Sequence, residues 1–359
     1  MTKPAIHQFA ANLSFGDAIS NDMLEIKAAL IRMGYESRIY AQYMDERMSK
    51  HFNLFNEYGG DKENLILFHA SIGGEVFDFV KNLPDKKIMI YHNMTPPEFL
   101  AGYNDHLANL LTSGPMKIKE ILPYISYVVG DSDFNRRDIV DMGFDETKTD
   151  VLPIFVDFQK YDRPLNVNLQ RDLKANGMKN ILFVGRFVPN KCHEDLIKAF
   201  YIYHRHFNKK SRLILIGNSD GMENYYLRLR KLVKMLEIEP FVVFGEHVDF
   251  DDLATYYKSA DLFLSMSEHE GFLVPVLECF HLGIPFLAYK GGAVSETMGG
   301  GGVLFEKKDF GELAKMMHQI IIDEAFKKEI VGRQRDRVHN FHRGHVEKKL
   351  EAVISKVLN

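Results

Sequence analysis

The sequence is poor in cysteine, with only Cys192 and Cys279 among its 359 residues. Two isolated cysteines make neither a disulfide framework nor a CxxC metal motif, so we expect both to be reduced packing residues. No run approaches the roughly 18 to 20 apolar residues of a membrane-spanning helix, and the first residues lead into a predicted strand without a signal-peptide core. These absences argue against a disulfide-stapled scaffold or a helical membrane protein, and we expect a cytoplasmic location.

The sequence also lacks a strong charge of either sign, with 45 Lys and Arg against 49 Asp and Glu. The first 160 residues carry 16 against 23, a net charge of −7, and the remainder carries 29 against 26, a net charge of +3. A weakly basic second half suits an anionic ligand, whereas an acidic first half disfavours a polybasic membrane-docking face. No basic stripe with interleaved aromatics is present, so we expect no nucleic-acid partner, while peripheral membrane association stays open.

Several cofactor and metal motifs are missing or incomplete. Neither Gly16 nor Gly217 lies in a full GxGxxG, and no Lys-Ser or Lys-Thr follows the glycine run at 299–302, which disfavours nicotinamide and P-loop sites. Asp131-Ser132-Asp133 has the Asp-x-Asp spacing of metal-dependent transferases of another fold, but it opens a helical segment, where Ser and Asp are capping residues. The closely spaced histidines at 204 and 206, and at 339, 342 and 345, lack nearby carboxylate or thiolate partners that would complete a metal site. We therefore expect no metal and no cofactor.

Short apolar strands alternate with amphipathic helices along the whole chain. This alternation is typical of parallel sheets with helices on both faces, and it predicts an α/β protein with two doubly wound domains. The predicted strands are 6–10, 37–41, 65–69, 87–92, 127–129, 151–154, 181–184, 213–216, 242–244, 262–266, 286–289 and 302–305. We place the N-terminal domain at 1–160, a linker at 161–180, the C-terminal domain at 181–335 and a terminal helical segment at 336–359.

The most informative motif is the run from Ser267 to Glu278. It follows a predicted buried strand, and Pro275 suits the first turn of the next helix. Gly271 allows the loop backbone to approach a ligand closely, and Glu270 and Glu278 can both face the carboxyl edge of the sheet. Carboxylates beside free amides suit a ligand with a diphosphate and vicinal hydroxyls, such as a sugar nucleotide, although an ordinary capped helix with two surface glutamates fits the spacing equally well.

A second motif runs from Asn180 to Lys191, where a predicted strand ends at Gly185. Arg186 and Lys191 then precede a segment with a helical apolar period. Two cations at a helix N-terminus can hold a diphosphate and stabilise the charge that develops on it as a leaving group. The alternative is a pair of solvated surface cations.

Together and in this order, the two motifs resemble those of the retaining glycosyltransferases of family 4, which have the GT-B fold. Further segments are similar to bacterial members that build surface polysaccharides, namely 13–20, 91–99, 131–136 and 151–153. The resemblance implies two Rossmann-like domains that face each other across a cleft, with the acceptor side in the N-terminal domain and the nucleotide sugar on the C-terminal domain. It also implies that the terminal helix returns to the N-terminal domain.

The resemblance further implies roles for individual residues. Two are expected to act directly on the transferred sugar: His92 and Glu270. The others are expected to bind the donor: the glycine loop over the phosphates (Gly16, Asp17), the diphosphate cations (Arg186, Lys191), the turn at the base (His247, Val248), the loop amides (Gly271, Phe272, Leu273) and the ribose carboxylate (Glu278). Many members have glycine at the position of Leu273, so its bulky side chain leaves the identity of the donor sugar open.

We therefore predict a metal-independent retaining glycosyltransferase that moves a hexose from a GDP- or UDP-sugar to a hydroxyl of a glycan or glycolipid. Mannose is the first expectation for the hexose, on resemblance alone. Two alternatives remain, a sugar-nucleotide epimerase or hydrolase on the same scaffold and a catalytically silent transferase-like binding subunit.

Overall fold

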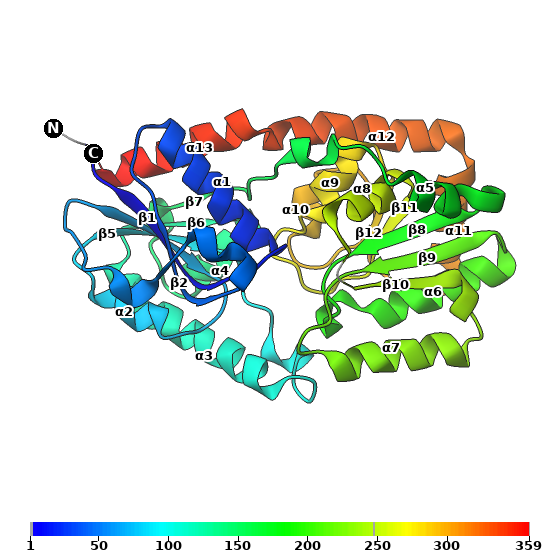
Figure 1. Cartoon of the computed structure of the whole chain (residues 1–359), viewed down its shortest axis with the longest axis horizontal. Helices are drawn as coiled ribbons and strands as arrows, with labels where there is room; N and C mark the ends of the chain where they lie inside the picture. Colours follow the sequence, from blue (N-terminus) through cyan, green and yellow to red (C-terminus); the bar gives the residue numbers. More distant parts are fainter. Residues whose placement is uncertain (1–2, 247, 359) are drawn as a thin grey trace. The chain divides into compact units, whose positions relative to one another are not determined.

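The computed structural model describes residues 3–246 and 248–358. The chain divides into two compact units (Figure 1). The first comprises Met1–Glu98, His106–Asp157 and Asn340–Asn359, and the second comprises Phe99–Asp105 and Phe158–His339. The segment predicted as a linker, 161–180, lies in the second unit and contains the helix α5 (Val167–Lys174).

The first unit is built on a seven-stranded parallel sheet of order β3-β2-β1-β4-β5-β6-β7. Its strands are β1 (Ile6–Leu13), β2 (Ile39–Met44), β3 (Phe52–Leu54), β4 (Leu65–Ala70), β5 (Lys86–Tyr91), β6 (Tyr127–Gly130) and β7 (Thr149–Val151). The central strands β1 and β4 are buried along almost their whole length, which explains why they are continuous apolar runs in the sequence. The edge strand β3 was not predicted because it is short and only partly buried.

The helices of the first unit are α1 (Ala18–Arg32), α2 (Val76–Asn82), α3 (Asp105–Ile121), α4 (Asp133–Asp141) and α13 (Arg343–Leu358). The terminal helix α13 buries Val346, Leu350, Val353 and Ile354 in the core that α1 shares with β1, β4 and β5. Figure 1 shows α1 and α13 beside each other, and Arg343 of α13 pairs with Glu25 of α1 at 2.7 Å. The last helix of the sequence is therefore part of the first unit.

The second unit contains a six-stranded parallel sheet of order β10-β9-β8-β11-β12-β13. Its strands are β8 (Lys179–Val184), β9 (Ser211–Ile216), β10 (Val242–Gly245), β11 (Leu262–Ser265), β12 (Phe286–Tyr289) and β13 (Val303–Phe305). Aromatic side chains fill its centre, where the rings of Phe263 and Phe286 stack at 4.7 Å. All six strands overlap the predicted ones, because each is a short apolar run between turn residues.

The helices of the second unit, in addition to α5, are α6 (His193–His206), α7 (Glu223–Met235), α8 (Phe250–Lys258), α9 (Pro275–Leu282), α10 (Val294–Met298), α11 (Phe310–Ile322) and α12 (Glu324–Val338). Helix α6 contacts α7 and α11, while α9 contacts α8, α10 and α12. Pro275 begins α9, and Gly283 ends it in the left-handed conformation at φ 69°. This arrangement of proline first and glycine last is favoured at helix ends.

The strand order reverses beside β1 in the first unit and beside β8 in the second. Doubly wound sheets bind ligands at such switch points, beyond the carboxyl ends of the strands. The predicted class of two Rossmann-like domains is thus confirmed. Within the described residues, no helix is both long and apolar enough to cross a membrane.

Candidate functional site

The loop between β11 and α9 holds the first of the predicted carboxylates, Glu270. Its side chain is 7% exposed, and both of its oxygens accept hydrogen bonds of 2.6 Å from the ammonium of Lys191. The Glu270 carbonyl accepts a bond of 2.8 Å from the amide of Ala293, and a Cβ on Gly292 would lie 2.3 Å from that carbonyl oxygen. The structure therefore brings together two residues that were predicted from separate motifs, and it fixes the loop that carries one of them.

Lys191 and Arg186 lie between β8 and α6 but have different surroundings. Lys191 is 18% exposed and paired with Glu270. Arg186 is exposed, and the described part of the chain gives its side chain no ion pair or hydrogen bond. A Cβ on Gly217 would lie 2.0 Å from the carbonyl oxygen of Gly185, so the loops after β8 and β9 touch at Arg186. A permanent cation next to a helix N-terminus can bind a phosphate group.

The second predicted carboxylate, Glu278, is buried in the first turn of α9. The hydroxyls of Tyr161 and Tyr257 donate to its two oxygens, the latter at 2.5 Å, and Lys160 contacts it at 3.2 Å. Burial, followed by the Glu278 charge, raises the pKa of Tyr257 well above its usual value, so this hydroxyl remains a donor. Each carboxylate oxygen has two lone pairs, so acceptor capacity remains for further hydroxyls such as those of a ribose.

The loop 271–273, whose amides were predicted to bind the donor, has an unusual backbone conformation at its last residue. Leu273 has φ 67°, in the left-handed region that favours glycine, and its side chain is buried. The carbonyl of Phe272 accepts a bond of 2.6 Å from the hydroxyl of Thr297. The chain thus keeps a glycine-type backbone with a bulky residue on it, and Gly271 remains partly exposed at the start of the turn.

The turn after β10 was predicted to hold the base. His247 lies outside the described residues, and Val248 is partly buried against Gly245, where a Cβ would lie 3.2 Å from the Val248 side chain. Glu246 in the same turn accepts a hydrogen bond from Ser219. A role of this turn in base binding therefore remains a prediction.

In the first unit, the predicted glycine loop lies between β1 and α1. Gly16 has φ 77° and open space around its Cβ position. Asp17 caps α1, because its side chain accepts bonds of 3.0 Å from the amide and the hydroxyl of Ser20. The structure thus gives Asp17 a capping role in addition to the predicted role at the donor phosphates.

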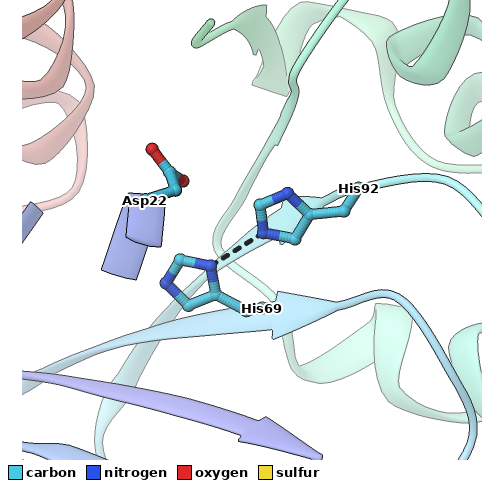
Figure 2. A group of neighbouring side chains, drawn as sticks. All are labelled: Asp22, His69 and His92. Carbon is cyan, nitrogen blue, oxygen red and sulfur yellow. Dashed lines mark hydrogen bonds between the residues drawn. The ribbon is translucent and has the colours of Figure 1, made fainter. Parts of the chain in front are cut away.

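His92 follows β5 and is buried in a chain of hydrogen bonds. Its Nδ1 lies 2.8 Å from an oxygen of Asp131, and its Nε2 lies 2.8 Å from Nδ1 of His69 (Figure 2). The Nε2 of His69 lies 3.0 Å from the amide oxygen of Gln8. His92 is therefore held at both ring nitrogens rather than exposed on a loop.

The three side chains of the Asp131-Ser132-Asp133 motif make different contacts. Ser132 caps α4 by accepting a bond of 3.1 Å from the amide of Asn135, as predicted. Asp131 contacts His92, whereas Asp133 pairs with Arg136 and Arg137, each at 2.6 Å. The two carboxylates thus have different partners.

Two groups of described residues have the composition of a metal site, Asp22 with His69 and His92, and Cys192 with Asp195 and Glu268. In the second group, Lys308 bridges Asp195 and Glu268 at 2.9 and 2.7 Å. A cation therefore already neutralises those carboxylates, and we retain the expectation that the second unit uses no metal.

The sequence of the second unit matches a known family. Residues 168–337 match the family model described as glycosyl transferases group 1. The match covers slightly less than half of the chain, so it relates this segment to that family. The resemblance found in the sequence is confirmed for this segment, and Lys191, Glu270 and Glu278 all lie within it.

The relatives of this chain have names that indicate different substrates. The N-acetyl-alpha-D-glucosaminyl L-malate synthase of Bacillus anthracis is 29% identical over 52% of this chain and 47% of its own. A GDP-mannose-dependent alpha-mannosyltransferase of Corynebacterium glutamicum is 26% identical over 76% of this chain and 62% of its own. The match to the first relative thus spans about half its length.

A solved structure, Anabaena Alr3699/HepE in complex with UDP and glucose, covers 98% of this chain and 99% of its own, with a TM-score of 0.77 and 16% identity. At that identity the likeness concerns the fold, and it confirms the GT-B class.

Sequence reasoning missed the residues that surround the predicted ones. Tyr161, Tyr257, His69 and Gln8 lie on four different elements, and no local motif marks them. The position of His69 in a predicted strand could have indicated it. His69 lies near the end of β4, and His92 directly follows β5, the neighbouring strand of the sheet. Polar residues at adjacent carboxyl strand ends come together in a parallel sheet.

Proposed function

We propose that this protein is a retaining glycosyltransferase that transfers a hexose from a nucleoside diphosphate sugar to a hydroxyl of a glycan or glycolipid. The observation that carries the proposal is the buried pair of Lys191 and Glu270 at the carboxyl edge of the second sheet, with the exposed Arg186 in the same loop as Lys191, inside the segment that matches the family. It combines an exposed cation with a buried ion pair on loops that glycines bring into contact. Such fixed charges stabilise a leaving diphosphate without reorganisation.

The roles within the proposed reaction follow from these surroundings. Arg186 and Lys191 neutralise the diphosphate, and Glu278, with two tyrosines on its oxygens, accepts hydrogen bonds from the ribose hydroxyls. Glu270 lies beside the transferred sugar and orients Lys191. Cations of the protein then supply the charge that a divalent ion supplies in metal-dependent transferases, so the reaction requires no metal.

We propose mannose from GDP-mannose as the first donor to test. Support comes from the resemblance and from the name of the GDP-mannose-dependent relative. The competing donor is UDP-glucose, because the solved structure of similar fold carries UDP and glucose. Many members of the family have glycine at the position of Leu273. We expect the Leu273 side chain to reshape the sugar pocket and so to determine which sugar is accepted.

A thermal-shift screen of nucleoside diphosphates and their sugars tests the donor site. A ligand that binds only the folded protein stabilises it by about 2.7 kcal/mol at a concentration of 100 times its Kd. We expect a shift with GDP-mannose, reduced in Arg186→Ala by a roughly 10- to 100-fold loss of affinity. Arg171→Ala, at an exposed position of α5, is the matched control. Equal binding by all three proteins would refute the diphosphate assignment.

A further inference from the structure

Four buried side chains form one line of hydrogen bonds across the strands β1, β4, β5 and β6 of the first sheet. It runs from Gln8 on β1 through His69 on β4 and His92 after β5 to Asp131 after β6. Gln8, His69 and Asp131 are at most 2% exposed, and the side chain of His92 is 1% exposed. Water is therefore absent from most of the line, and its protons must be shared among its members.

The direction of the first bond is fixed by Gln8. Its amide nitrogen donates to the carbonyl of Met23 at 2.9 Å, so its amide oxygen faces His69. An amide oxygen only accepts, so Nε2 of His69 carries a proton. The tautomer of His69 thus follows from a bond on the far side of Gln8.

A count of protons then fixes the charge of the pair of rings. The three contacts of the line need one proton each, and neither the Gln8 oxygen nor an ionised Asp131 supplies one. Two neutral imidazoles carry only two, so one ring carries a third. That ring is His92, because it lies against Asp131, whose carboxylate is hydrogen-bonded only to His92 among the described residues.

The electrostatic surroundings act on all members of the line that titrate. Burial raises the pKa of Asp131 above its usual value, whereas the charge of His92 and the hydrogen bond to it act in the opposite direction. Burial opposes a charge on His92, but the Asp131 carboxylate and its hydrogen bond outweigh burial and raise the pKa of His92, with smaller contributions from Asp22 and Asp17 of the adjoining α1 segment. Burial, followed by the charge of His92, lowers the pKa of His69. Burial also raises the pKa of Asp22 to about 7, so near neutral pH this carboxyl is only partly ionised and adds less than a full charge beside His92.

A metal ion between Asp22, His69 and His92 is the competing explanation (Figure 2). Zinc binds imidazole nitrogens at about 2.0 to 2.1 Å in a tetrahedron, which separates two such nitrogens by roughly 3.3 Å. The facing nitrogens of His69 and His92 are 2.8 Å apart, a hydrogen-bond length. The geometry therefore fits a shared proton and leaves too little room for an ion.

We propose that Asp131 and His69 are positioning residues for the transfer, which together hold His92 as an imidazolium whose Nε2–H is reserved for a hydroxyl of the donor sugar. The proton on Nδ1 is committed to Asp131, and Nε2–H is held by His69, so a sugar hydroxyl accepts Nε2–H only by taking the place of Nδ1 of His69. His69 accepts it while the site is empty. This inference rests on the proposed function only for the role of the sugar hydroxyl, since the proton count is independent of any ligand.

Nuclear magnetic resonance of the full chain labelled with ¹⁵N at histidine tests the proton count directly. His69→Gln and His92→Gln assign the two rings. We expect His92 to carry protons on both nitrogens at pH 7, above the usual pKa of a histidine, and His69 to be the neutral tautomer with its proton on Nε2. A His92 that is neutral at pH 7, or a stoichiometric metal that is lost in His69→Gln, would overturn the proposal.

Turnover of Asp131→Asn, with Asp133→Asn as the matched neighbour, tests the positioning role. An asparagine amide can donate to Nδ1 of a neutral His92, so the variant keeps the bonds and loses the charge. We expect kcat to fall about 100-fold with KM changed less than about threefold, whereas Asp133→Asn stays near the parent. Rates of Asp131→Asn that equal the parent at every pH would refute the role. Absence of turnover in the parent would refute the proposed function instead, and the resonance experiment would still decide the proton count.

Discussion

The pair of Lys191 and Glu270 allows structural and ligand-binding roles to be separated by double substitution. The pair is buried, with side chains 18% and 7% exposed and both oxygens 2.6 Å from the ammonium. Removing one partner of a buried pair leaves the other charge stranded, at a cost of about 3 to 5 kcal/mol for full burial. Because Lys191 retains some exposure, we expect Lys191→Met to lower the free energy of unfolding by about 2 to 4 kcal/mol.

The double variant Lys191→Met, Glu270→Gln removes the stranded charge along with its partner. We expect it to recover most of the lost stability, to within about 1 to 2 kcal/mol of the parent. Binding of GDP or UDP should stay weak, because the diphosphate still lacks the Lys191 cation. Urea unfolding at pH 7 and calorimetric titration measure the two effects. A double variant no more stable than Lys191→Met, or one that binds nucleotide like the parent, would refute the reasoning.

Two further predictions concern positions beside the proposed donor loops. Burial lowers the pKa of His193 to about 3. Between pH 6.5 and pH 3 the unfolded chain is therefore protonated at His193 and the folded chain is not, so the free energy of unfolding decreases as the pH decreases. Between pH 7 and pH 5, the free energy of unfolding of His193→Leu, measured with urea, should therefore decrease by about 2 kcal/mol less than that of the parent. Parallel pH profiles of the two proteins would contradict this. At Leu273, both truncations should destabilise the fold, but Leu273→Gly should be about 1 kcal/mol more stable than Leu273→Ala, because only glycine adopts φ 67° without strain. The opposite order would show that the left-handed backbone is not maintained.

The strands could be predicted well because parallel strands buried on both faces are continuous apolar runs. The prediction failed where that signal is weak. The edge strand β3 is half-exposed, and the segment predicted at 151–154 is displaced from β7, at Thr149–Val151, whose residues are partly exposed. At such edges, pairing with the neighbouring strand decides the structure, and pairing is not encoded in local hydrophobicity.

The candidate site was predictable as far as its residues lie in local motifs. Glu270 and Glu278 could be assigned to a strand-to-helix loop because glycine and proline mark it. The pairing of Glu270 with Lys191, and the tyrosines on Glu278, depend on which strands lie side by side, so no sequence spacing reports them.

The line through His92 illustrates the same limit in the first unit. Its members come from four strands or the residues that follow them, and the strand order β1-β4-β5-β6 brings them together. Asp131 was interpreted as part of a helix cap, which is correct for Ser132 beside it. Asp131 and Ser132 have different roles although they are adjacent, because successive residues at the end of a strand point to opposite faces of the sheet.

The central claim is retaining, metal-independent transfer from a nucleoside diphosphate sugar, and analysis of the reaction product tests it most directly. The full chain is incubated with GDP-mannose or UDP-glucose, a panel of glycan and glycolipid acceptors and a strong chelator, and the product is followed by nuclear magnetic resonance. We predict a new glycosidic bond with the anomeric configuration of the donor, formed at the same rate with and without the chelator. Inverted product, free or epimerised sugar as the only product, or transfer that stops on chelation and returns with Mn²⁺ would contradict the account.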